Sequence, residues 1–312
     1  MIQILDKESP KLIGTYTNNN YKVSLFSDGT KIRETEDDDF KPEFPETMDV
    51  CISTKCSHGC SFCYSNCTPN GKEADFIEIF NSGIFDDIQP YTEIAININS
   101  HSHKYLMEFL NEMKERKVIV NATINQIDFE RTWQGLQALC EGEYIHGLGI
   151  SLVSVTDAFV KKVKEFPNAI IHVINGIVSP MQIKELADHD LKLLILGYKQ
   201  VGRGIDWYSQ EGEEIRKRQN WLNNNLPIMA KHFKIISFDN LALEQLSVDK
   251  LLSPEEYAER YMGDDGNFSF YLNLVDMTFS KNSLDTNHYK INGQSIKQMF
   301  HFIQKKVKEE RK

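Results

Sequence analysis

The chain has 312 residues, of which 41% are hydrophobic and 26% are charged, an ordinary composition for a globular protein that buries a substantial core. Its formal net charge of −10 disfavours duplex DNA or bulk RNA as a partner, because the overall field repels polyanions. Charges occur within the first eight residues and no apolar run approaches transmembrane length, so we expect a cytoplasmic protein without a signal peptide or a membrane span.

Residues 1–47 form an extension ahead of the main domain. Two stretches of alternating polar and apolar residues begin at Tyr21 and Thr30, and the pair Asp28-Gly29 between them is a strong hairpin turn signal. The pattern predicts a two-stranded β-hairpin that lies over one side of the main domain.

The segment 48–232 alternates between short apolar runs and longer amphipathic stretches. The apolar runs predict strands that begin near Met48, Glu93, Lys117, Gly147, Ala169 and Leu191. The amphipathic stretches predict helices at 75–87, 104–115, 128–140, 157–165 and after Pro180. This repetition is typical of βαβ units, so we expect an α/β domain whose parallel sheet is covered by helices.

The rhythm of the sequence changes after Gly204. The later elements that we expect are a long helix at 207–224, a strand at 233–239, a helix at 251–261, one or two strands at 267–280, and a C-terminal helix from about 294. The C-terminal helix carries apolar side chains on one face, at Ile296, Met299, Phe300, Ile303 and Val307. Residues 233–312 therefore predict an α+β cap that closes the open side of the main domain.

Five of the six cysteines lie in one short segment, which begins in the first predicted strand of the main domain and continues into the loop after it. Cys56, Cys60 and Cys63 have the spacing C-x3-C-x2-C, and three thiolates on one loop repel each other unless a metal neutralises them. Iron–sulfur clusters select thiolate ligands, and a set of three leaves one iron open to a ligand that is not protein. A structural zinc site completed by His58 or Cys67 is the alternative, and a disulfide framework is the weakest reading.

The segment from Cys56 to Tyr64 resembles the C-x3-C-x-aromatic-C signature of the radical S-adenosylmethionine (SAM) enzymes. The resemblance implies that Cys56, Cys60 and Cys63 hold a [4Fe–4S] cluster whose fourth iron binds SAM, and that Phe62 and Tyr64 flank the adenine. It implies reductive cleavage of SAM to a 5′-deoxyadenosyl radical, which abstracts hydrogen from a substrate. An electron donor such as flavodoxin or ferredoxin is the partner implied.

The same resemblance implies a partial (β/α)6 barrel, in which ligands lie at the carboxyl ends of the strands. On the fifth strand Ile174 and Gly176 match the family's pattern, whereas His172 and Ser179 replace its glycine and glutamate. Ser151, at the end of the fourth strand, stands where the family often contacts the ribose or the methionine carboxylate. Taken singly, a polar residue at such a place is more often a turn or helix-cap residue.

The second-strand motif departs from the family. Asn97 and Asn99 stand where Gly-Gly-Glu-Pro usually grips the methionine ammonium group. An asparagine oxygen can accept a hydrogen bond from that group but carries no charge, so the contact would be weaker. The departure places the details of SAM binding in doubt, but not the cluster.

Two basic residues lie among glycines at the end of the sixth strand. Lys199 and Arg203 suggest a clamp for a carboxylate or phosphate, and a flexible exit loop with solvated charges is an equal alternative. We expect Lys199 to contact the cofactor, and Tyr198, Arg203 and Asp239 to be candidates for substrate contact.

The sequence thus predicts a radical SAM enzyme that acts on a small molecule or a peptide. No cysteine follows Cys140, so the auxiliary clusters of the SPASM and twitch subfamilies are not expected. Cys51, Cys67 or Cys140 could donate a hydrogen atom. The alternatives are a non-catalytic iron–sulfur or zinc protein with a decayed SAM site, and a nucleotide- or tRNA-modifying radical SAM enzyme.

Overall fold

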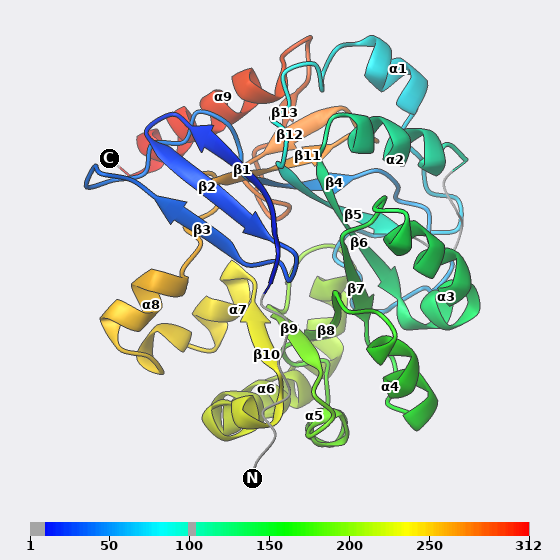
Figure 1. Ribbon diagram of the computed structural model, residues 1–312. Helices are drawn as coiled ribbons and strands as arrows, with labels where there is room; N and C mark the ends of the chain where they lie inside the picture. Colours follow the sequence, from blue (N-terminus) through cyan, green and yellow to red (C-terminus); the bar gives the residue numbers. More distant parts are fainter. Residues whose placement is uncertain (1–9, 99–103, 312) are drawn as a thin grey trace.

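The computed structural model describes residues 10–98 and 104–311. Within these residues the largest element is a ten-stranded sheet of order β10-β9-β8-β7-β6-β5-β4-β11-β12-β13 (Figure 1). Its strands are β4 (Thr47–Cys51), β5 (Glu93–Ile98), β6 (Ile119–Asn125), β7 (Gly147–Ser151), β8 (Ala169–Ile174), β9 (Lys192–Leu196), β10 (Ile235–Phe238), β11 (Ser269–Asn273), β12 (Thr278–Ser280) and β13 (Tyr289–Lys290). The strands from β10 to β11 run parallel, and β12 and β13 are antiparallel.

Six helices follow the strands β4 to β9 in turn and lie around the outside of the sheet (Figure 1). They are α1 (Phe76–Asn81), α2 (Leu106–Glu115), α3 (Gln126–Glu141), α4 (Asp157–Lys164), α5 (Pro180–Leu186) and α6 (Arg203–Met229). Four of them begin at a side chain that accepts hydrogen bonds from the first free backbone N–H groups, namely Asp75, Asn125, Thr156 and Ser179. The mixed α/β fold and the six predicted strand–helix repeats are confirmed, and α6 is longer than expected at both ends.

Alternation along the strands separates two faces of the sheet. In β8, for example, Ile171 and Val173 are buried against the helices, whereas His172 and Ile174 remain partly exposed on the other side. We call this second side the open face. The helix-covered side supplies most of the core, where truncation of a side chain such as Phe109 would cost roughly 3–5 kcal/mol.

The N-terminal segment forms a three-stranded antiparallel sheet of β1 (Leu12–Asn18), β2 (Tyr21–Phe26) and β3 (Lys31–Glu34). The predicted hairpin of β2 and β3 is confirmed, and the first strand is an addition to it. Tyr21 and Val23 of β2 pack with Ile119 at the start of β6. This contact places the three-stranded sheet over the amino ends of the main strands.

Buried ion pairs connect the N-terminal sheet to the main sheet. The Lys31 ammonium lies 3.3 Å from Glu46 and 2.5 Å from Glu93, and the Arg33 guanidinium lies 2.9 Å from Glu46. The Glu46 side chain is fully buried, so its charge depends on these partners.

The C-terminal segment adds strands to both ends of the parallel sheet. β10 pairs with β9, as expected, while β11 pairs in parallel with β4, so the strands of the predicted cap belong to the main sheet. The segment also contains α7 (Asn240–Gln245), α8 (Pro254–Arg260) and α9 (Ile296–Glu310), and the predicted apolar face of α9 is buried. Two short 3-10 helices lie at Ala230–His232 and Val248–Lys250. Across 10–98 and 104–311, none of the helices combines the length and apolar character needed to cross a membrane.

Candidate cluster and cofactor site

The cysteine loop, residues 52–75, connects the carboxyl end of β4 to α1. Backbone hydrogen bonds fold it back on itself, including Cys56 N–H to the Thr68 carbonyl at 2.8 Å and Cys63 N–H to the Cys60 carbonyl at 3.2 Å. The loop is therefore a compact unit whose three predicted cluster ligands have fixed places on the backbone.

The thiols of this loop influence one another electrostatically. Burial raises the pKa of the Cys60 thiol, and negative charge on Cys63 and Cys56 raises it further. A hydrogen bond from the Cys67 thiol lowers the pKa of Cys63, and the same bond raises the pKa of Cys67. In the described part of the chain, no group of three or more His, Cys, Asp and Glu side chains is placed to hold a metal ion. The donor set itself, three thiols on one loop, suits an iron–sulfur cluster.

Arg203, the first residue of α6, reaches back to this loop. Its Nε donates to the Cys60 carbonyl and its Nη1 to the Cys67 carbonyl, both at 3.0 Å. Its backbone N–H lies 3.2 Å from the Cys63 carbonyl and 2.8 Å from Asn66 Oδ1. The sequence predicted a substrate contact here, whereas in the structure these donors fix the cysteine loop.

Two glycines beside Arg203 allow this close approach. Gly202 has φ of +55°, and a Cβ there would lie 2.3 Å from the Tyr64 carbonyl oxygen. A Cβ on Gly204 would lie 2.3 Å from the Lys199 carbonyl oxygen. The glycines that suggested close backbone approach in the sequence thus bring the end of β9 against the cysteine loop.

Lys199 connects the cysteine loop with the C-terminal segment. Its ammonium lies 4.1 Å from the centre of the Tyr64 ring and donates to Ser283 Oγ at 3.2 Å. A fixed positive charge therefore stands beside Tyr64, as an anion contact would require. Phe62 is half-buried and Tyr64 is exposed, so both aromatic residues lie on accessible parts of the loop.

Asp49 is a site residue that the sequence interpretation missed. Its neighbours in β4, Met48 and Val50, are buried on the helix side, and this alternation places Asp49 on the open face. Solvent reaches its side chain, although many protein atoms surround it. This burial raises the pKa of its carboxyl, the charge of Lys199 opposes the rise, and Asp265 and Asp239 add to it.

Two further predicted cofactor contacts lie at strand ends on the open face. Asn97 donates from Nδ2 to the Ser53 carbonyl at 3.1 Å, which ties β5 to the cysteine loop. Ser151 ends β7 and lies opposite His172 of β8 in the sheet register. Asn99 lies outside the described residues.

Ser179 and Asp239 cap helices. Ser179 Oγ accepts from Gln182 N–H at 3.2 Å, and the Gln182 side chain accepts from Ser179 N–H, a reciprocal capping box at the start of α5. Asp239 Oδ1 accepts from Ala242 N–H and from Gly197 N–H, each at 2.8 Å. Both side chains cap a helix in the structure, and their proposed contacts with cofactor and substrate stay predictions.

Tyr198, Gly176 and Ile174 also have structural contacts. The Tyr198 side chain is buried and its hydroxyl donates to the Gly204 carbonyl at 2.8 Å. Gly176 has φ of +93°, and a Cβ there would lie 2.7 Å from Ile215 of α6. Ile174 ends β8 on the open face, so of these three it lies nearest to the predicted cofactor side.

Fold and site together define an α/β protein with a helix-covered parallel sheet and a three-cysteine loop at the carboxyl end of a strand. No protein-family model matches the chain, and a search of curated proteins finds no match.

Among solved structures, the chain is similar to SuiB of Streptococcus suis. The structure of SuiB bound to the precursor peptide SuiA has a TM-score of 0.53 and 13% identity, covering 85% of this chain and 65% of the SuiB chain. The structure bound to S-adenosylmethionine has a TM-score of 0.51 and 13% identity, covering 80% and 64%. The chain thus spans less than two thirds of SuiB, and at this identity the similarity establishes the fold.

Proposed function

We propose that the protein is a radical SAM enzyme with a single [4Fe–4S] cluster, built on a partial (β/α)6 barrel formed by β4 to β9 and α1 to α6. The observation that carries the proposal is the three-cysteine loop at the carboxyl end of β4, in a fold similar to that of SuiB, which has been solved with SAM bound. Together the cluster and SAM supply a 5′-deoxyadenosyl radical that abstracts hydrogen from a substrate.

Cys56, Cys60 and Cys63 are the proposed cluster ligands. Loss of the thiol protons on binding would leave three negative charges on one loop, which the irons neutralise. Arg203 keeps the loop backbone in place through the carbonyls of Cys60 and Cys67. The chain thus supplies both a thiol donor set and a brace for the loop that carries it.

The remaining cofactor contacts follow from the positions around this loop. Phe62 and Tyr64 are proposed to flank the adenine, and Lys199, beside the Tyr64 ring, to bind the methionine carboxylate. Asn97 and Ser151, on the open face, would orient the amino group and the ribose. Asn99 is proposed as a further contact.

The substrate class is a peptide or a small molecule. SuiB has been solved with a precursor peptide, and the net charge of −10 disfavours a nucleic acid. We further propose a flavodoxin or ferredoxin as electron donor and a cytoplasmic setting, where thiols stay reduced.

The test is anaerobic reconstitution, reduction with dithionite in the presence of SAM, and chromatography for 5′-deoxyadenosine. We expect product from the wild type and from Cys140→Ala, a control that removes a half-buried thiol outside the loop, because hydrogen donation to a substrate radical would follow SAM cleavage. Cys60→Ala should give none. Four bound irons without 5′-deoxyadenosine would favour a non-catalytic cluster protein, and bound zinc in place of iron would refute the proposal.

A further inference from the structure

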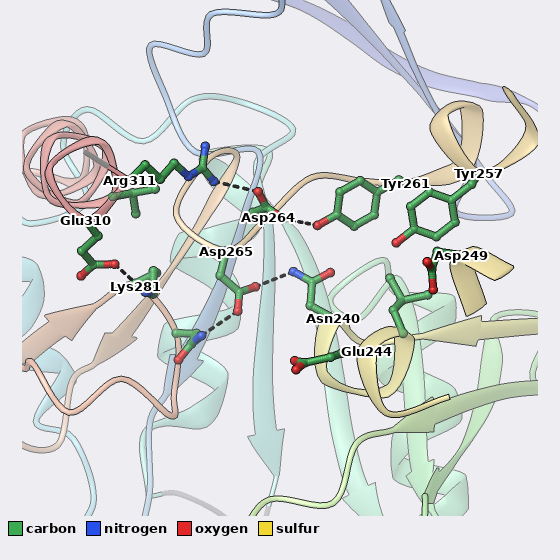
Figure 2. A pocket seen from close by; sticks show the side chains of 13 residues that line it. Asn240, Glu244, Asp249, Tyr257, Tyr261, Asp264, Asp265, Lys281, Glu310 and Arg311 are labelled. Carbon is green, nitrogen blue, oxygen red and sulfur yellow. Dashed lines mark hydrogen bonds and ion pairs between the residues drawn. The ribbon is translucent and has the colours of Figure 1, made fainter. Parts of the chain in front are cut away.

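A cavity of about 570 Å³ opens between the segment that follows β10 and the C-terminal helix α9. Figure 2 shows its walls: Asn240 and Glu244 of α7, Tyr257 of α8, and Glu310 of α9 come from three separate helices. We call it the outer cavity. Of the contacts proposed for the cluster or SAM, none that lies within 10–98 and 104–311 lines this cavity.

A smaller cavity of about 120 Å³ continues from the outer one toward the open face of the sheet. The two share the side chains Asp265, Lys281 and Asn282, and the smaller one, the inner cavity, extends to Asp49 and Tyr271. The two cavities are therefore adjacent, and the inner one reaches Asp49, whose carboxyl also feels the charge of Lys199. A ligand in the outer cavity can reach toward the proposed reaction site.

Some of the charges in the outer cavity compensate each other. Arg311 pairs with Asp264 at 2.7 Å, and Lys281 pairs with Glu310 at 2.9 Å, as the dashed lines in Figure 2 show. These two pairs account for both cations of the cavity wall.

Three further carboxylates of the outer cavity have no cationic partner among the described residues. Asp265 accepts hydrogen bonds from neutral amides, Asn240 Nδ2 at 2.7 Å and Asn282 Nδ2 at 2.6 Å. Glu244 and Asp249 are exposed, and neither side chain has a hydrogen bond or an ion pair within 10–98 and 104–311. The wall therefore has a surplus of negative charge that a bound cation would neutralise.

Two tyrosines complete the outer cavity. The rings of Tyr257 and Tyr261 stack with centres 5.3 Å apart and 19° between their planes. Asp249 lies beside the Tyr257 hydroxyl in Figure 2. Burial raises the pKa of that hydroxyl, and the negative charge of Asp249 raises it further. Aromatic faces next to carboxylates attract ammonium and guanidinium groups through both charge and the ring quadrupole.

Asp49 is an independent sign of a cationic ligand. It lines the inner cavity and makes no hydrogen bond or ion pair within the described residues, and the surrounding protein raises the pKa of its carboxyl. A cation that reaches the inner cavity would supply the charged partner that this carboxylate lacks.

We propose that the outer cavity admits a substrate carrying a cationic group, a primary ammonium or a guanidinium, which Glu244, Asp249 and the tyrosine pair hold at the mouth of the path to Asp49. This inference rests on the proposed function and specifies its substrate class. A basic side chain of a peptide and a free polyamine share the chemistry, and the experiment distinguishes them.

The test is isothermal titration calorimetry on the full reconstituted chain, at low and at high salt. The probes are spermidine, the peptide acetyl-Gly-Lys-Gly-Arg-Gly-amide, and its neutral counterpart with glutamine and citrulline. We expect a cationic probe to bind, the neutral peptide to bind far more weakly, and Glu244→Gln/Asp249→Asn to weaken cation binding about tenfold, since each exposed ion pair contributes up to about fivefold. Both residues are exposed, so the variant should fold.

A matched control is Glu211→Gln/Glu213→Gln, which removes the same net charge from the exposed surface of α6. Its affinity should equal that of the wild type. Binding of the peptide alone assigns the cation to a peptide side chain, binding of spermidine alone assigns it to a free polyamine, and binding of both assigns it to the ammonium group that they share. The proposal would be overturned if neither spermidine nor the basic peptide bound. It would also be overturned if Glu244→Gln/Asp249→Asn and the control weakened binding equally. Because the assay does not involve SAM cleavage, its result is separable from the test for 5′-deoxyadenosine.

Discussion

Replacement of Arg203 by methionine should loosen the cysteine loop without unfolding the protein. The change removes two hydrogen bonds from a charged donor, Nε to the Cys60 carbonyl and Nη1 to the Cys67 carbonyl, each at 3.0 Å. Such bonds contribute roughly 1.5–3 kcal/mol each when buried. Arg203 is partly exposed, so we expect a net loss of about 2 kcal/mol, which corresponds to about thirtyfold more frequent local opening.

Hydrogen exchange followed by mass spectrometry measures that opening directly. Amides of the cysteine loop should exchange faster in Arg203→Met, and iron uptake in anaerobic reconstitution should fall below that of the wild type. Arg218→Met is the matched control, because Arg218 lies on the same helix and donates to the Ile177 carbonyl at 2.6 Å, at a site that does not involve the cysteine loop. Unchanged exchange in the loop of Arg203→Met, or the same change in the control, would refute the reasoning.

Three further changes test the fold and the site. Glu46→Gln leaves the buried guanidinium of Arg33 without a carboxylate partner and leaves Lys31 with Glu93 alone, so it should cost about 3 kcal/mol in urea unfolding. A cost below about 1 kcal/mol would contradict the buried-pair assignment. Burial lowers the pKa of His172 from 6.5 to about 4, so as pH falls this residue binds a proton in the unfolded state before it does so in the folded state. The free energy of unfolding should therefore drop by about 2 kcal/mol between pH 7 and pH 5. His172→Asn should remove that drop, and an unaltered pH dependence would count against it. Gly202→Ala should reduce iron uptake, because its Cβ would meet the Tyr64 carbonyl, and normal loading would contradict this close approach.

The repeating part of the fold was predictable because its signals are local. The six strands of the β/α repeats are short apolar runs, and the helices between them carry the periodicity of one buried face. The face of α9 follows the same rule, and Ile296, Met299, Phe300, Ile303 and Val307 are all buried. Periodicity reports which side of an element is buried, which is why these predictions hold.

Pairing between distant segments was not predictable in this way. The parallel register of β11 with β4 joins Ser269 to Thr47, and no local pattern in either segment identifies the other as its partner. The hydrogen bonds from the Arg203 guanidinium to the Cys60 and Cys67 carbonyls likewise join segments far apart in the sequence, and no local pattern predicts them. Asp49 differs, since the alternation of β4 already placed it opposite the buried Met48 and Val50, and that signal went unused.

The position of β4 inside the sheet affects how the protein matures. The strand that leads into the cysteine loop is bordered by β5 on one side and by β11 on the other, and β11 is synthesised more than two hundred residues later. During translation, β4 therefore remains an open sheet edge until most of the chain has left the ribosome. Insertion of the proposed cluster into a fully supported loop would then be a late step, and a nascent chain truncated before Ser269 should expose its thiols to oxidation.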